Sequence, residues 1–150
     1  MQEKESTTAK KEVLEPGAVM LRSLAIAEVK SWLDFQGINE AKREVLSNSM
    51  NRIIDAVTIG LVVFKEDKSV VQKLRFPFGA EQFTITELKF KPSIKVGDVQ
   101  TQMLGTRDDD SFASAMAHIS AATGEPKAVI QEMNNKDYKL SDAIIVFFML

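Results

Sequence analysis

Apolar and polar residues alternate between Val70 and Lys91, which is the pattern of a β-hairpin with one buried face. The alternation places five apolar residues on that face: Leu74, Phe76, Phe78, Phe83 and Ile85. A four-residue loop over 79–82 would set Phe78 opposite Phe83 and Phe76 opposite Ile85. We expect this hairpin to lie at the centre of the fold, with helices covering its apolar side.

The hairpin pattern contains two irregularities. After Ile85 the apolar positions slip by one residue, and this slip predicts a β-bulge near Thr86-Glu87. Pro77 has no N–H to donate to a neighbouring strand, so we expect the first strand to lie at an edge of the sheet near this residue. The predicted hairpin core consists of Leu74, Phe76, Phe83, Ile85 and Phe90.

A pair of helices is expected before the hairpin. Apolar residues begin directly after Pro16-Gly17, and their spacing predicts a helix over Ala18 to Phe35 with a broad apolar face. Gly37 suits the end of that helix and Asn39 suits the N-cap of the next, so the connection between them is tight. The second helix carries one apolar stripe: Leu46, Met50, Ile53, Ile54 and Val57.

A third strand and several short helices complete the pattern. The short apolar run Ile59–Phe64 predicts a strand, and three strands are more stable than an isolated hairpin. Helical spacing returns at Val96 and ends at Gly105. Three more helices are expected from their boundary residues. The first begins after Asp108 to Asp110 and ends at Gly124, and the second begins at Pro126 and ends at Asn134-Asn135. Asp137 is expected to cap a last helix through Leu150.

Together these elements predict an α+β fold with an N-terminal helical hairpin, a small antiparallel β-hairpin or three-stranded sheet, and a cluster of short C-terminal helices. The first residues are charged and polar, so a flexible tail is expected at 1–15. The helical pair spans 16–57, and the hairpin with its helices spans 58–150.

Charge and composition narrow the functional classes. The formal net charge is −2, so no overall attraction to nucleic acid or to an anionic membrane is expected. The chain has no cysteine, which excludes disulfides, thiolate metal sites and cysteine nucleophiles. No secretory signal and no membrane-spanning apolar stretch are visible, so we expect a cytoplasmic protein without a membrane partner.

The residue types that carry chemistry are isolated from one another. His118 is the only histidine and lies in an alanine-rich stretch, which favours a structural role over zinc binding or acid–base catalysis. Asp108 to Asp110 lack the spacing of a calcium loop, which favours helix capping. No phosphate loop, dinucleotide motif or serine elbow occurs. We therefore expect no enzymatic activity, cofactor, metal or small-molecule substrate.

Two stretches are candidates for protein binding. The outward residues of the hairpin form a predicted basic face: Lys73, Arg75, Lys89 and Lys91. Such a face either prevents edge-to-edge aggregation or binds an acidic partner, with protein favoured over nucleic acid because no solvent-facing aromatic residue lies between the charges.

The second stretch is the apolar C-terminus, Ala143–Leu150, which as a helix would send apolar residues in all directions. Either another chain covers some of them, or the helix is buried between the two halves of this protein. The candidate binding residues are Ile144, Ile145, Phe147 and Phe148.

The order of short motifs resembles the tail assembly chaperones of long-tailed phages. These motifs are TELKFKPSIKVGDV over 86–99, then Ala122-Thr123-Gly124 and Pro126, and finally Asp137-Tyr138 before an apolar helix. The helical region 16–57 is longer than the family's usual N-terminal part, and the junction around Pro92 is two residues longer. The resemblance implies a non-enzymatic protein that binds the tape-measure protein while the tail tube assembles.

Other functions remain open on the sequence. The chain is alternatively a structural component retained in a phage tail, baseplate or related contractile injection particle. A nucleic-acid-binding regulator would use Asn39–Val57 as a recognition helix, with Lys42, Arg43 and Arg52 as its bases, but the overall charge disfavours this. The expected partners are a tape-measure or other tail protein and a second copy of this chain.

Overall fold

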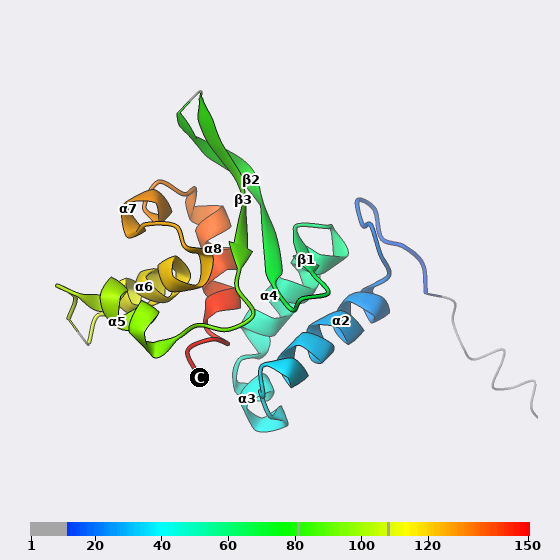
Figure 1. The fold of residues 1–150 in the computed structure, drawn as a ribbon. Helices are drawn as coiled ribbons and strands as arrows, with labels where there is room; N and C mark the ends of the chain where they lie inside the picture. The colour runs from blue at the N-terminus through cyan, green and yellow to red at the C-terminus, as the bar shows by residue number, and fades with distance from the viewer. Residues whose placement is uncertain (1–11, 81, 108) are drawn as a thin grey trace, which may run out of the picture.

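The computed structural model describes residues 12–80, 82–107 and 109–150. An antiparallel sheet of three strands lies in the middle of the fold, with helices before it and short helices after it (Figure 1). The predicted α+β class and the order of its parts are confirmed. Most of the predicted tail, 1–11, lies outside the described residues. Glu12 contacts the body of the protein, because its carboxylate accepts the N–H of Ser23 at 2.8 Å.

The N-terminal helices are α2 (Arg22–Phe35), α3 (Glu40–Val45) and α4 (Ser47–Thr58). Asn39 is the N-cap of α3, as predicted, and its side chain accepts the N–H of Lys42 at 2.9 Å. The expected single second helix is interrupted at Leu46, where the backbone leaves the helical region with φ −100° and ψ 26°. The connection between α2 and α3 is tight and α2 packs against α4, so the helical hairpin is present with a break in its second arm.

The sheet consists of β1 (Val62–Phe64), β2 (Val70–Ala80) and β3 (Phe83–Phe90) in the order β1-β2-β3. Phe78 pairs with Ile85 and Ala80 with Phe83, so the predicted register was wrong by two residues. The loop was predicted to span 79–82, but Gly79 and Ala80 belong to β2. Gly79 permits this tight end because its φ is +121° and any Cβ there would lie 2.3 Å from the carbonyl oxygen of Phe83.

The predicted bulge occurs on the other strand. The Lys73–Glu87 pair and the Phe78–Ile85 pair enclose the segment Leu74–Pro77 on β2 but Thr86 alone on β3. The extra residues of the bulge therefore lie on β2, the strand that contains Pro77. The ring nitrogen of Pro77 cannot donate a hydrogen bond to a neighbouring strand. Strand β1 pairs with residues 70–72 only, so β2 has a free edge beside Pro77, as expected.

The C-terminal helices are α5 (Val96–Met103), α6 (Ser111–Thr123), α7 (Lys127–Ile130) and α8 (Asn135–Ile145). Asp110 caps α6 by accepting the N–H of Ala113 at 3.0 Å, and Gly124 ends this helix with φ +79°, both as predicted. Asp137 was predicted to cap the last helix, which is wrong. Asn134 is the cap, since its side chain accepts the N–H of Lys136 at 2.9 Å.

The core joins the two ends of the chain. Trp32 of α2 packs edge-on against Phe147 with ring centroids 5.8 Å apart, and it also contacts Phe64 and Phe148. Of the predicted C-terminal surface, Ile144, Ile145 and Phe147 are buried and Phe148 is partly buried. The expectation that these residues form an exposed binding surface was wrong, because other parts of the same chain cover them, Trp32 of α2 and Phe90 of β3 among them. Burial inside the same protein, the other alternative, is what the structure shows.

The predicted core of the hairpin is confirmed in part. Leu74, Ile85 and Phe90 are buried, whereas Phe76 and Phe83 are exposed. Among the described residues, no helix combines the length and the apolar character needed to span a lipid bilayer.

Candidate protein-interaction site

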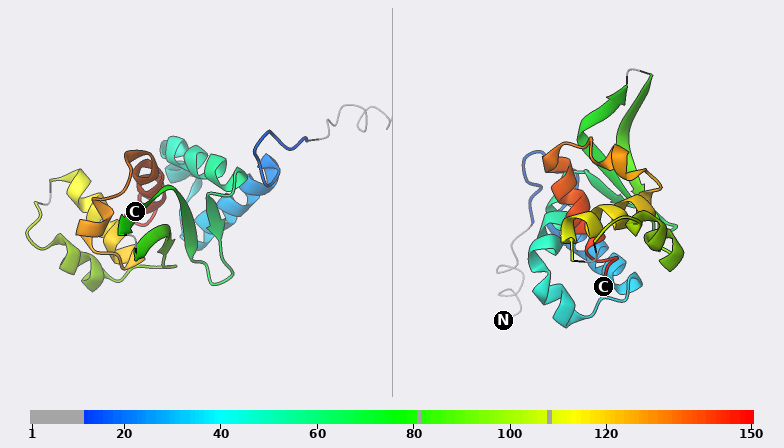
Figure 2. Two further views of the ribbon diagram at one scale, coloured as in Figure 1. Left: turned by 90° about the horizontal axis from the view of Figure 1, so that it is seen from above. Right: turned by 90° about the vertical axis from the view of Figure 1, so that its left-hand side faces the viewer.

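The outer end of the β2–β3 hairpin projects beyond the helices (Figures 1 and 2). We call residues 76–85 the arm; of these, Glu81 lies outside the described residues. An isolated two-stranded hairpin is marginally stable in water, and polar side chains normally cover such a projection. The arm carries exposed phenylalanine residues instead.

One face of the arm is apolar from its root to its tip. Phe78 pairs with Ile85 and Ala80 pairs with Phe83, so these four side chains lie on the same face of the two-stranded ribbon. Ile85 is buried against the core and Phe78 is partly buried, but Phe83 is 72% exposed. Phe76, in the irregular segment of β2, is 45% exposed. An apolar strip thus runs from the core into solvent.

The root of the arm is held by a carboxylate from α8. Asp137 is only 2% exposed, and its two oxygens accept the backbone N–H groups of Arg75 at 2.9 Å and Phe76 at 3.0 Å. These N–H groups lie in the surplus segment of β2, where the partner strand offers no regular ladder. The carboxylate therefore replaces the missing strand partner and stabilises the bulge.

Two further buried polar side chains complete this contact. The Gln72 amide donates from Nε2 to the backbone carbonyl of Asp137 at 2.9 Å, and the Ser141 hydroxyl donates to the amide oxygen of Gln72. We call Gln72, Asp137 and Ser141 the polar clamp. Each of its three side chains is buried, so their hydrogen bonds are shielded from water and hold α8 at one position on β2.

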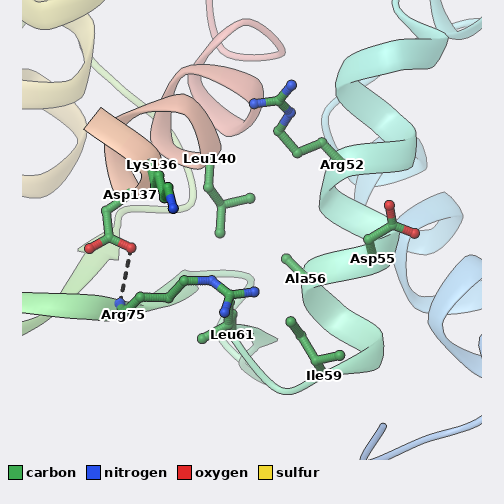
Figure 3. A pocket seen from close by; sticks show the side chains of 9 residues that line it. All are labelled: Arg52, Asp55, Ala56, Ile59, Leu61, Arg75, Lys136, Asp137 and Leu140. Atoms are coloured by element: carbon green, nitrogen blue, oxygen red, sulfur yellow. Dashed lines mark hydrogen bonds between the residues drawn. The ribbon is translucent and has the colours of Figure 1, made fainter. Parts of the chain in front are cut away.

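A hollow of about 210 Å³ lies beside the root of the arm, between α4, β2 and α8. Three basic side chains from these three elements line it: Arg52, Arg75 and Lys136 (Figure 3). Its floor is apolar and includes Ala56, Ile59, Leu61 and Leu140. We call it the basic hollow.

The predicted basic face of the hairpin does not exist as one surface. Lys73 lies opposite Glu87, and the amine of Lys89 is 3.9 Å from a carboxylate oxygen of Asp67, so acidic neighbours offset these two charges. Arg75 turns instead into the basic hollow, because the irregular segment begins directly before it. Lys91 is exposed beyond the end of β3. The error follows from assuming a regular alternation through the bulge.

Other residues with predicted roles are engaged in structural contacts. The Nδ1 atom of His118 is 2.7 Å from the carbonyl oxygen of Ser114, one turn earlier in α6. Arg43 was a candidate base of a recognition helix, but it is buried, pairs with Asp34 and donates to the carbonyl of Ile38. It therefore has no free surface for nucleic acid. In the part of the chain that the structure describes, no group of three potential metal ligands converges.

The sequence interpretation missed Gln72, Asp137 and Ser141 as a functional unit. Two signals were present in the chain. Gln72 shares its face of the strand with the apolar residues Val70 and Leu74, two positions away on either side, where an amide needs a buried partner. Asn134 precedes Asp137 by three residues, which is the spacing of a cap followed by an acidic residue in the first turn. The spacing assigns the cap to Asn134 and leaves the Asp137 carboxylate free for another partner.

Tyr138, the neighbour of the clamp, gives the protein a sensitivity to alkaline pH. Its hydroxyl is buried and has no hydrogen-bond partner among the described residues. Burial, assisted by the negative charge of Asp142, raises the pKa of Tyr138 from 10.0 to about 12. Above pH 10.0 only the unfolded chain ionises readily at this residue, so the folded state loses stability as pH rises from there to about 12.

Replacing Tyr138 with phenylalanine is expected to remove this loss. The parent should lose about 1 kcal/mol more than the variant across that alkaline range, after allowance for solvent screening of a half-buried side chain. Below the range the variant should be at least as stable as the parent, because no hydroxyl remains buried without a partner. Urea denaturation of both proteins at a series of pH values measures the difference. If the free energy of unfolding fell equally for the two proteins across this pH range, Tyr138 would not be the source of the alkaline loss.

Comparisons with protein-family models, with curated proteins and with solved structures gave no match to this chain.

Proposed function

We propose that this protein is a non-enzymatic assembly factor that binds a partner protein through the arm. The observation that carries the proposal is the exposure of Phe76 and Phe83 on a projection whose root is fixed by hydrogen bonds to the buried side chain of Asp137. Exposed aromatic residues on a positioned element are typical of binding surfaces, since they add apolar area without a large loss of conformational entropy.

The size of the aromatic surface fits a reversible contact. Complete burial of one phenylalanine side chain is worth roughly 1.5–3 kcal/mol, and both residues retain much of their accessible surface. Losses of translational and side-chain freedom on association offset part of this gain. The arm alone therefore supports capture and release of a partner rather than a permanent complex.

The resemblance of the chain to tail assembly chaperones gives this function a specific form. On that basis we propose that the partner is the tape-measure protein and that binding takes place in the host cytoplasm during tail assembly. A structural component of a tail, baseplate or contractile injection particle would use the same arm for permanent docking.

Replacing both Phe76 and Phe83 with serine is expected to abolish partner capture without unfolding the protein. Both side chains lie outside the core, so the change removes apolar contact area at small cost to stability. The measurement is an affinity pull-down of the full chain from cells that also express its neighbouring genes. The expected product is a long helical protein bearing several copies of this chain, recovered with the parent and absent with the variant.

A matched control is available on the opposite part of the molecule. Phe35 is 48% exposed and Val45 is 83% exposed, which is close to the exposure of the two arm residues. The Phe35/Val45 double serine variant should capture the partner like the parent. Equal capture by the arm variant would show that the arm is not the binding surface.

Mass spectrometry of finished particles separates the two forms of the proposal. A chaperone is absent from them, and a structural component is present in fixed stoichiometry.

A further inference from the structure

We infer that the basic hollow binds acidic side chains of the partner segment that packs on the arm. This inference deepens the proposed function and rests on it. The ligand chemistry is a carboxylate, supplied by a glutamate or aspartate within an otherwise apolar stretch of protein. Neither the resemblance nor the sequence pattern assigns a role to this hollow.

The charges around the hollow are not balanced locally. In the described residues, no ion pair involves Arg52, Arg75 or Lys136. Two carboxylates line the same hollow, but both have other partners. Asp55 pairs with Arg22 at 2.6 Å, and the Asp137 carboxylate accepts the backbone N–H groups of Arg75 and Phe76. Three cations therefore line one concave surface whose two carboxylates already have other partners.

The hollow and the arm are adjacent along β2. Arg75 lines the hollow, and the next residue, Phe76, begins the arm. The clamp binds the backbone N–H of both residues, so it fixes where their side chains leave the strand. A segment that packs on Phe76 lies within reach of the cations of the hollow. The apolar floor beneath these cations suits a segment in which acidic and apolar residues are mixed.

The basic surface continues along the groove between α4 and α8. Arg52 also lines a second hollow of about 260 Å³, together with Lys139 and Asp142. The groove therefore carries several cations interrupted by single carboxylates. This alternation accommodates separate side-chain carboxylates, whereas the repeating phosphates of a nucleic acid would meet Asp55 and Asp142. The net charge of −2 also disfavours a polyanion.

The test uses the full chain and a defined probe. The probe is a fluorescein-labelled peptide in which glutamate and leucine alternate, and its control has glutamine in place of glutamate. Fluorescence anisotropy is expected to show about tenfold tighter binding of the glutamate peptide, because its carboxylates form charge-assisted hydrogen bonds with the arginines. Rising salt concentration should reduce this preference for the glutamate peptide over the glutamine peptide.

Charge variants locate the binding to the hollow. Arg52→Gln combined with Arg75→Gln should abolish the preference, while the backbone N–H of residue 75 remains available to Asp137. Lys30→Gln combined with Lys95→Gln removes the same charge from exposed positions outside the hollow and should retain the preference. Circular dichroism of both variants confirms that they fold.

Three results would overturn the inference. They are equal affinity for the two peptides, an unchanged preference in the Arg52/Arg75 variant, and displacement of the glutamate peptide by single-stranded oligothymidine at lower concentration than by unlabelled peptide. The partner pull-down distinguishes failure of this inference from failure of the proposed function. If the Arg52/Arg75 variant captures the partner as the parent does and the arm variant does not, the arm function stands and the hollow has no part in it.

Discussion

Replacing Phe147 with alanine is expected to lower the free energy of unfolding by about 3–5 kcal/mol. The side chain is 2% exposed and packs edge-on against Trp32, so truncation removes its buried apolar area and leaves a cavity beside the indole. Trp32 belongs to α2, and the loss therefore affects the contact between the N-terminal helices and the C-terminal end of the chain. Urea denaturation followed by circular dichroism measures the change.

Leu150→Ala provides the control for this experiment. Leu150 is also an apolar residue of the C-terminal stretch, but it is half exposed, and its truncation should change stability by less than about 0.5 kcal/mol. If Phe147→Ala were no more destabilising than Leu150→Ala, the burial of the C-terminal stretch within this chain would be refuted. A surface role for Phe147 and Phe148 would then become the better interpretation.

Asp137→Ala is expected to lower the free energy of unfolding by about 2–4 kcal/mol. The substitution leaves the backbone N–H groups of Arg75 and Phe76 without their acceptor in a partly buried site. It also removes a side chain of α8 that holds the irregular part of β2. Beyond the loss of stability, the arm should lose its fixed orientation, so partner capture in the pull-down should weaken although both phenylalanines remain.

Asp142→Ala separates this effect from a general change of charge on α8. Asp142 is exposed, and its carboxylate makes no ion pair in the described residues. Its removal should change stability by less than about 0.5 kcal/mol near neutral pH.

Asp137→Asn is the second variant of interest, since its amide oxygen can accept one of the two N–H groups while its NH₂ group cannot accept the other. Stability of Asp137→Asn equal to that of the parent would contradict the role assigned to the carboxylate.

Local signals in the sequence predicted several of the helix boundaries. Asn39 and Asp110 cap the helices that they were expected to cap, and Gly124 adopts the left-handed conformation that ends α6. Each of these signals depends on atoms within a few residues, so no knowledge of the rest of the fold is needed. The order of helices and strands followed from the same kind of information.

Register and burial could not be predicted in the same way. The apolar alternation showed that an irregularity exists in the hairpin, but it could not show which strand carries the surplus residues. The acceptor for the backbone N–H groups of Arg75 and Phe76 is the carboxylate of Asp137, more than sixty residues later in the chain. Without that contact the regular register is the simpler choice, and it places Phe76 and Phe83 in the core.

Most of the candidate site could not be predicted from the sequence, because it also depends on contacts between distant parts of the chain. Eight consecutive apolar residues at the C-terminus indicate that something covers them, but the pattern does not distinguish α2 from another chain. Arg75 was identified as a candidate binding residue, whereas Arg52 and Lys136 join it only through the packing of α4 and α8 on β2. Concave sites that are assembled from distant elements leave no local pattern.

The Asp137 carboxylate binds the main chain of β2 at positions 75 and 76 and not the side chains there. Any amino acid other than proline presents the same N–H at positions 75 and 76, so the anchoring of the arm does not depend on which residues stand there. Phe76 and Phe83 also lie outside the core. Substitution of these two phenylalanines can therefore change the outer surface of the arm without changing how its root is anchored, because the anchoring depends on Asp137.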